Sequence, residues 1–389
     1  MQVQAFIIQD QWLSKLTSAL KNYVSPSLRF QIRQTPPQLK HFFSRLNWLK
    51  WQHYSFLLNE TNLTTVHYNG CPENRPVLMA LLGADSAISC PAIPNDDEVY
   101  VTDHAMRHAI CIPFCLMTIV KLGRPIEDIV ATYSNRLIRY IKSQRANYRY
   151  QVIDSFEKID AIENNMLKPY ASARHGAGAA QLGPGVVQKI AQKAYGRLDL
   201  LLQGDEEVGC HLGNSYTRKG KRYWHVNRLA YPSNVFLDTK RWGEVNSINL
   251  HLALESAIDN GYDYCDYGGS LARPGDGLID WKRRRRGLLA THDNFDYFYM
   301  KLPKTGGAQF LWDSPVFGVE RGKPTLHLGI PEGKTEEEML ARYHEMGYGG
   351  LYKVYLDCVT PPSAQFVESI RALFADQDPQ PLIISYIVG

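Results

Sequence analysis

The sequence has none of the short motifs that mark several common enzyme classes. Its 389 residues contain no Walker A loop, no glycine-rich dinucleotide fingerprint, no HExxH zinc motif and no GxSxG nucleophile elbow. The seven cysteines are scattered, without the paired spacing of zinc ligands. Cys111 and Cys115 lie within an apolar run, where small buried thiols are common. We therefore expect no metal site, and dispersed cysteines of odd number favour a reducing cytoplasm.

Long hydrophobic runs are also few. The longest, residues 110–120, contains Pro113 and is about half as long as a bilayer-spanning helix. We interpret it as part of a buried helix over residues 104–122. Residues 1–5 lack the basic segment and apolar core of a secretory signal. The sequence thus predicts a cytoplasmic protein with no membrane span.

The charges nearly balance, with 43 Lys and Arg against 39 Asp and Glu, so the total does not indicate a nucleic-acid binder. Their distribution is more informative. Five consecutive cations, residues 282–286, follow an apparent strand, residues 262–269, which ends in Gly268 and Gly269. A concentrated positive site at the end of a sheet suits a phosphate-bearing donor, and it indicates a transferase.

A strand pattern occurs twice along the chain. Alternating strands with Gly and Asp turns, followed by a helix with 3.6-residue periodicity, predict a β-meander and then a helix. The first copy has predicted strands at 77–82, 87–90 and 98–101 before the helix at 104–122. The second has strands at 199–203, 208–213 and 222–226 before a helix at 245–260. The repetition suggests a tandem duplication; chance similarity of two meanders is the alternative.

The two ends of the chain are less informative. Residues 1–75 are predicted to form a mainly helical cap, and residues 295–302 a closing strand. The tail, residues 304–389, is predicted to form a further α/β unit whose elements are separated by prolines. Its predicted strands are 325–329, 351–357 and 382–388, and its predicted helices are 335–346 and 362–375.

Three short segments carry a resemblance to known acyltransferases. They are residues 134–139 with the strand 148–152, Pro169-Tyr170 with Arg174-His175-Gly176, and the ending Gly277-Leu278…Trp281-Lys282…Gly287. These segments, and the meander–helix–strand unit, resemble the GNAT acyltransferase fold. Their doubling resembles the Fem-type branch, whose members carry two GNAT-like halves and transfer amino acids from aminoacyl-tRNA.

The resemblance implies an α/β (α+β) architecture of tandem GNAT-like mixed sheets flanked by helices, with a C-terminal α/β extension. The implied divisions are an N-terminal cap (1–75), a first half (76–165), a second half with the donor site (166–303) and the extension (304–389).

Acyl transfer to an amine requires a base and a group that offsets charge on the attacked carbonyl. By resemblance Lys282 occupies the Fem-type lysine position, where an ammonium would stabilise the oxyanion. Asp266 ends the predicted strand and is a candidate base or orienting group, while His225 and His211 are candidate proton acceptors. Each also has a structural interpretation: a solvated charge run, a capped turn or a packed histidine.

Donor and acceptor contacts are expected around this region. Two basic segments are candidates for binding the donor phosphates. Salt bridging or a plain surface turn is the alternative. The two segments comprise Lys240, Arg241 and Gly243, and Arg283, Arg284, Arg285 and Arg286. The candidate substrate contacts are Arg174, His175, Tyr223, Trp224, Tyr267 and Trp281.

The leading hypothesis is an N-acyltransferase in which a small-molecule or peptide amine attacks an acyl-CoA-type donor directly. No cofactor would be tightly bound, and acyl-CoA or aminoacyl-tRNA would be the co-substrate. An aminoacyl-tRNA-dependent Fem-like transferase is the first alternative. A non-catalytic GNAT-like binding module, its cleft plugged by Trp242 or Trp281, is the second. The oligomeric state is not predicted.

Overall fold

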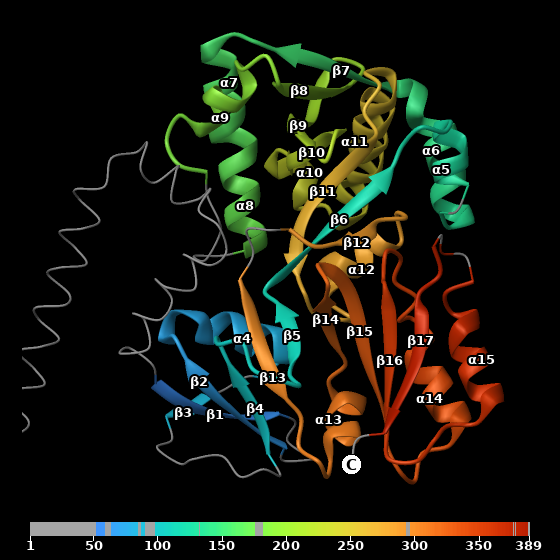
Figure 1. Cartoon of the computed structure of the whole chain (residues 1–389). Coiled ribbons are helices and arrows are strands. Elements are labelled where there is room, and N and C mark those ends of the chain that lie inside the picture. Colours follow the sequence, from blue (N-terminus) through green and yellow to red (C-terminus); the bar gives the residue numbers. More distant parts are fainter. Residues whose placement is uncertain are drawn as a thin grey trace, which may run out of the picture.

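The computed structural model describes residues 52–58, 64–84, 87–89, 98–131, 133–175, 182–292, 296–375, 377 and 379–387. Most of the predicted N-terminal cap, residues 1–51, lies outside the described residues. Three mixed sheets flanked by helices make up the described chain (Figure 1), which confirms the expected α/β architecture.

The largest sheet has seven strands in the order β12-β6-β11-β10-β9-β8-β7 and fills the upper half of Figure 1. Within this sheet only β10 and β11 pair in parallel. The bounds are β6 (Cys115–Lys121), β7 (Tyr148–Ile153), β8 (Gly196–Gln203), β9 (Glu206–Arg218), β10 (Lys221–Ala230), β11 (Tyr264–Leu271) and β12 (Leu288–Ala290). The sheet therefore takes strands from both sides of the predicted division at residue 165.

Helices cover both faces of this sheet, because successive apolar side chains along its strands point to opposite faces. On one face Leu200 and Leu212 pack against α7 (Phe156–Ile162), the π-helix η4 (Glu163–Leu167) and α9 (Val186–Ala191), with α8 (Lys168–His175) adjacent. On the other face Leu201 and Val226 pack among residues of α5 (Ile126–Val130), α6 (Asn135–Gln144) and α11 (Thr239–Asp259). The short helices α10 (Ser233–Phe236) and η3 (Arg145–Asn147) lead into α11 and β7.

The other two sheets share one hydrophobic core below the first (Figure 1). The six-stranded sheet runs β3-β1-β2-β4-β13-β5 and the four-stranded sheet β14-β15-β16-β17. Their strands are β1 (Gln52–Leu58), β2 (Thr64–Gly70), β3 (Ala87–Ser89), β4 (Val99–Thr102), β5 (Ile110–Pro113), β13 (Tyr297–Lys301), β14 (Val316–Glu320), β15 (Lys323–Ile330), β16 (Lys353–Cys358) and β17 (Leu382–Ile387). The remaining helices are η2 (Pro72–Asn74), α4 (Arg75–Leu82), α12 (Gly277–Arg283), α13 (Gly307–Asp313), α14 (Glu336–Tyr343) and α15 (Ala364–Ala372).

The second predicted meander and its helix are confirmed as β8, β9, β10 and α11, and the predicted strands and helices of the tail are confirmed as β15–β17 with α14 and α15. The first copy is wrong in two elements. Residues 77–82 are helical, because Pro76 lies in the first turn of α4 and Gly83 ends the helix with a φ of 71°. The predicted helix 104–122 is instead β5 and β6, whose continuous apolar run reflects burial on both faces.

The N-terminal prediction also needs correction within its described part. Residues 52–58 and 64–70 are antiparallel strands rather than helices. In the part of the chain that the structure describes, no helix combines the length and apolarity needed to cross a bilayer. The same residues contain no group of three His, Cys, Asp or Glu side chains placed to hold a metal ion.

Candidate active site

The candidate site lies where the parallel strands β10 and β11 separate. They pair only from Tyr223–Tyr264 to His225–Asp266. Beyond that point β10 stays with β9, while β11 stays with β6 on its other side. The facing edges of the two strands therefore have no ladder hydrogen bonds to each other, so an extended chain that enters between them could bond to either edge.

A β-bulge marks the point of separation. Asp266 pairs with Ile119 and Gly269 with Met117, so β11 has one more residue than β6 between the two pairs. Gly268 takes up the distortion with a φ of 77°, a conformation that favours glycine. A Cβ at Gly268 would also lie 3.5 Å from the His225 ring. Glycine thus satisfies the backbone and leaves room beside the imidazole.

Asp266 is the centre of a hydrogen-bonded cluster at the bulge. Its side chain is 1% exposed, and it accepts bonds from His225 Nδ1 at 3.0 Å and from the Tyr216 hydroxyl at 3.0 Å. The Gly268 amide donates to its other oxygen at 2.8 Å. Burial alone would raise the pKa of Asp266, but these bonds, His225 foremost, together hold it below its usual value.

The Asp266 contact also orients the His225 ring. With Nδ1–H donating to the carboxylate, the neutral imidazole carries its lone pair on Nε2. That atom has no hydrogen bond to any residue that the structure describes. The ring is about a quarter exposed, so Nε2 is available to a substrate proton.

Lys282 approaches the same bulge from α12. Its side chain is 3% exposed, and its ammonium donates to the carbonyls of Gly268 at 2.8 Å and Gly269 at 3.1 Å. Burial lowers its pKa to about 8, although the charge of Asp266 acts in the opposite direction. Gly268 therefore connects the two charged groups, because its amide bonds Asp266 and its carbonyl bonds Lys282.

Three tyrosines extend this face of the sheet across β9, β10 and β11. The rings of Tyr216 and Tyr223 stack at 4.9 Å, and those of Tyr223 and Tyr264 at 4.9 Å. Tyr264 also lines a shallow hollow of about 650 Å³, together with Tyr262, Lys121, Arg124 and Lys221. An aromatic row thus leads from the Asp266 cluster to a basic depression of the surface.

The structure does not bring His211 to this cluster. Its ring is fully buried and bonds Asp199 at 3.1 Å, and Arg197 completes that group with an ion pair to Asp199 at 2.8 Å. Arg197 bonds Ser256 of α11, which places the group on the α11 face of the sheet. Trp224 contacts the His211 ring on that same face.

Tyr267 and Trp281 belong to the apolar cluster under α11, so neither lies with the Asp266 side chain. Among the predicted substrate contacts whose side chains the structure describes, Tyr223 alone shares its row with Tyr216. Arg174 stacks on Trp242 with a separation of 4.2 Å, and Trp242 donates to the Tyr170 hydroxyl. His175 ends α8, and its side chain lies outside the described residues.

The predicted donor-binding residues at the start of α11 are largely occupied. Asp238 caps the helix by accepting from the amides of Lys240 and Arg241. Arg241 forms an ion pair with Glu206 at 2.7 Å. Gly243 lies within the first turns of the helix, with open space around its Cα. The free amides that would hold a phosphate are therefore already capped here.

The arginine run, residues 283–286, is likewise partly occupied by contacts within the protein. Arg283 pairs with Glu345 at 3.3 Å and with Asp280 at 3.7 Å. Arg285 is 9% exposed, stacks on Trp281 at 3.9 Å, and has no carboxylate of a described residue within ion-pair distance. Burial lowers its pKa to about 10. Arg284 is exposed and Arg286 partly so, which leaves two of the four for a ligand at the surface.

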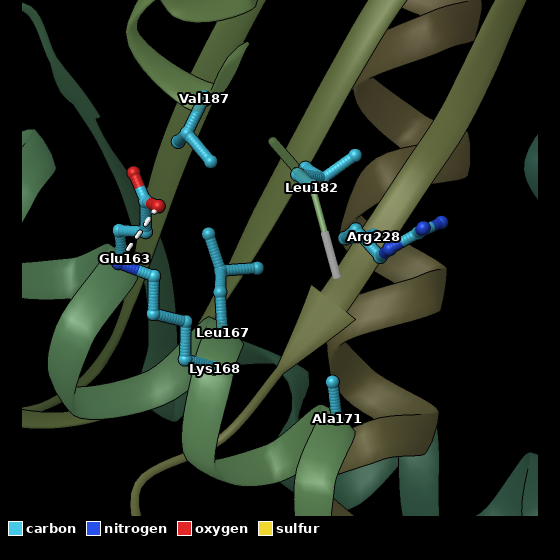
Figure 2. Close-up of a pocket in the computed structure, with 7 residues that line it drawn as sticks. All are labelled: Glu163, Leu167, Lys168, Ala171, Leu182, Val187 and Arg228. Atoms are coloured by element: carbon cyan, nitrogen blue, oxygen red, sulfur yellow. Dashed lines mark ion pairs between the residues drawn. The ribbon is translucent and has the colours of Figure 1, made fainter. Parts of the chain in front are cut away.

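A further cavity near this sheet is too small for a substrate. Figure 2 shows it between α8 and the end of β10, with the Glu163–Lys168 ion pair on one side and Arg228 on the other. Its volume is about 20 Å³, enough for one water molecule.

The sequence reasoning missed Tyr216 and the two glycine carbonyls. The predicted strand ended at residue 213, whereas β9 continues to Arg218. Continuing its period-2 alternation past Asn214 would have placed Tyr216 on the face of His225. The positions of these carbonyls depend on the bulge, so no residue type in the sequence indicates them.

Neither the protein-family models nor the curated proteins include a match to this chain. Among solved structures, FemX aligns with 11% identity and a TM-score of 0.36 over 66% of this chain and 90% of that one. L-PGS from Bacillus licheniformis aligns with 12% identity and a TM-score of 0.33 over 71% and 95%. A GCN5-related N-acetyltransferase from Anabaena variabilis aligns with 10% identity and a TM-score of 0.28 over 86% and 84%.

Proposed function

We propose that this chain is an acyltransferase in which an amine attacks an activated acyl group directly. One observation carries the proposal. At the point where β10 and β11 separate, Gly268 joins a His225–Asp266 pair to the buried ammonium of Lys282. A base thus lies where two strand edges separate, and a cationic group bonds the bulge beside it. Acyl transfer requires such a pair of groups.

In the proposed step, the acceptor amine loses a proton to His225 Nε2 as its nitrogen bonds to the acyl carbon. Asp266 keeps the imidazole in the reactive tautomer and stabilises the imidazolium that forms. Lys282 offsets the negative charge on the carbonyl oxygen. The carbonyl then re-forms, and the carrier leaves with the bonding electron pair and takes up a proton.

The acyl carrier is an acyl-CoA-type thioester in this proposal. The unpaired edges of β10 and β11 suit an extended chain bearing amide groups, since each edge presents N–H and C=O groups. Measuring thiol release from acetyl-CoA, with a panel of primary amines, tests it. Wild-type protein should release thiol, and His225→Gln and Asp266→Asn should slow release about 10²- to 10⁴-fold.

Lys189→Gln is the matched control, because Lys189 is exposed on α9 and takes part in none of the contacts of this cluster. Undiminished release by His225→Gln would contradict the role of the base. Absence of release with every amine would contradict the donor.

An aminoacyl-tRNA donor is the second candidate, and the basic hollow beside Tyr264 favours it. Lys121 and Arg124 border that hollow next to a row of stacked tyrosines, together with Lys221, which is paired with Asp263. Single-stranded RNA binds to such combinations of cations and aromatic rings. RNA binding should weaken steeply with salt, and removing one phosphate-binding lysine should lower the slope by about 1. Salt-independent transfer would leave the thioester as donor.

A further inference from the structure

A second cavity lies between the six-stranded and four-stranded sheets, away from the candidate active site. Its volume is about 530 Å³, and the ends of β5 and β13 face β14, β15 and β16 across it. None of its lining residues belongs to the Asp266 cluster. Small-molecule sites in proteins have volumes of roughly 300–1,000 Å³, so this cavity is large enough for a metabolite.

The four-stranded sheet presents a histidine–aspartate pair to this cavity. His327 Nδ1 lies 3.3 Å from an Asp357 oxygen, and the ring stacks on Tyr355 at 4.6 Å. Asp357 thereby fixes the tautomer of the neutral ring, with the lone pair on Nε2. Nε2 makes no hydrogen bond with the residues that the structure describes. All three side chains line the cavity.

Gly318 keeps that nitrogen accessible. It pairs with Thr325 on the neighbouring strand, two residues before His327. A Cβ at Gly318 would lie 3.2 Å from His327 Nε2 and 2.6 Å from the Thr325 hydroxyl. A side chain at this position would cover both polar groups, whereas glycine leaves them open.

The charges around the cavity favour an anionic ligand. Both lining carboxylates are already satisfied: Glu320 bonds Lys353 at 2.6 Å and the Tyr355 hydroxyl at 2.5 Å, and Asp357 bonds His327. The hydrogen bond from Lys353 is the main reason that the pKa of Glu320 lies below its usual value.

The basic side chains at the other side of the cavity are exposed. They are His108, Lys301 and Lys304. Neither His108 nor Lys304 pairs with a carboxylate among the residues described. His108 has a φ of 59°, an uncommon conformation for a residue with a side chain and one that occurs more often at functional positions.

We propose that this cavity binds a small organic anion. Its carboxylate or phosphate would lie against His108 and Lys304, and a hydroxyl or N–H group of the same molecule would donate to His327 Nε2. The apolar walls, including Met300 and Ile110, would contact its carbon skeleton. The inference is independent of the proposed acyl transfer, because the two sites share no residue.

Titration of the ¹⁵N-histidine-labelled full chain with citrate, glycerol 3-phosphate, AMP and inorganic pyrophosphate tests the proposal. A saturable shift of the His327 ring signals is expected with at least one organic anion and not with pyrophosphate alone. Citrate distinguishes a carboxylate ligand from the two phosphate esters. If no organic anion shifts these signals at millimolar concentration, the proposal is overturned.

Two variants separate specific binding from a surface effect. Gly318→Val should abolish the shift by covering Nε2, and Lys304→Ala should weaken binding about tenfold while leaving the exposed surface otherwise unchanged. Because Lys304 is exposed, its variant remains informative even if Gly318→Val does not fold. Lys323→Ala, an exposed lysine on β15 outside the lining, is the control. Equal binding by the Lys304 and Lys323 variants would contradict the assigned anion position.

Discussion

The burial of Lys282 predicts an unusual dependence of stability on pH. Its pKa is about 8 in the folded protein and 10.5 in an unfolded chain. Each pKa unit corresponds to about 1.4 kcal/mol, so keeping this ammonium buried at pH 7 destabilises the fold by about 3 kcal/mol. Between pH 8 and 10.5 the unfolded chain binds more protons than the folded one, so stability must rise with pH in that window.

Lys282→Met isolates this effect. The substitution removes the titrating group and leaves the Gly268 and Gly269 carbonyls without their donor, a cost that does not depend on pH. The difference in unfolding free energy between variant and wild type should therefore change by about 2.5 kcal/mol from pH 7 to pH 10, in favour of the wild type. Titrating groups that do not interact with Lys282 act equally on both proteins and cancel.

The assay is urea denaturation followed by tryptophan fluorescence at several pH values. Lys189→Met, in which an exposed lysine of α9 is replaced, is the matched control and should show no such change. A difference between Lys282→Met and wild type that stays constant from pH 7 to pH 10 would refute the reasoning. It would mean that the ammonium is hydrated in solution or that the chain opens around α12.

Two further predictions follow from the same region. Arg285→Met should stabilise the protein by about 1–3 kcal/mol in thermal unfolding. The reason is that it replaces a buried guanidinium, which lacks a carboxylate partner among the described residues, with an apolar chain. A lower melting temperature would show that the stacking on Trp281 outweighs the desolvation. Tyr216→Phe removes one of the bonds that hold the pKa of Asp266 down, so that pKa should rise, which carboxyl NMR titration of the labelled full chain measures. An unchanged pKa of Asp266 would show that the Tyr216 hydroxyl does not stabilise the carboxylate.

The sequence allowed the prediction of those candidate-site residues that lie at the end of a strand or in a run of charges. Asp266 and Lys282 were identifiable because the glycines after the strand and the cations after the turn are local features. His225 was identified together with His211, and the sequence could not separate them. The separation depends on register: His225 pairs with Asn214, and His211 lies three positions before Asn214, an odd offset that places the two histidines on opposite faces.

The errors in the first predicted meander have a different origin. A short apolar run has no periodicity that distinguishes a helix from a strand buried on both faces, so residues 110–120 were assigned to a helix. In β6, Leu116, Met117 and Thr118 are all buried in succession, which removes the alternation that would have identified the strand. For residues 77–82 the first-turn proline Pro76 and the C-cap Gly83 were the better signal, and they outweigh hydrophobic content.

The candidate site depends on a strand from the part of the chain that the sequence placed in another unit. The bulge at Gly268 is defined by pairing with β6, since only there does β11 hold the extra residue. Without β6, Asp266 and Gly269 would have no register to distort, and the Gly268 and Gly269 carbonyls that Lys282 bonds would turn elsewhere. The base, the ammonium and the opening between β10 and β11 are thus a consequence of the whole seven-stranded sheet, and residues 166–303 do not contain them alone.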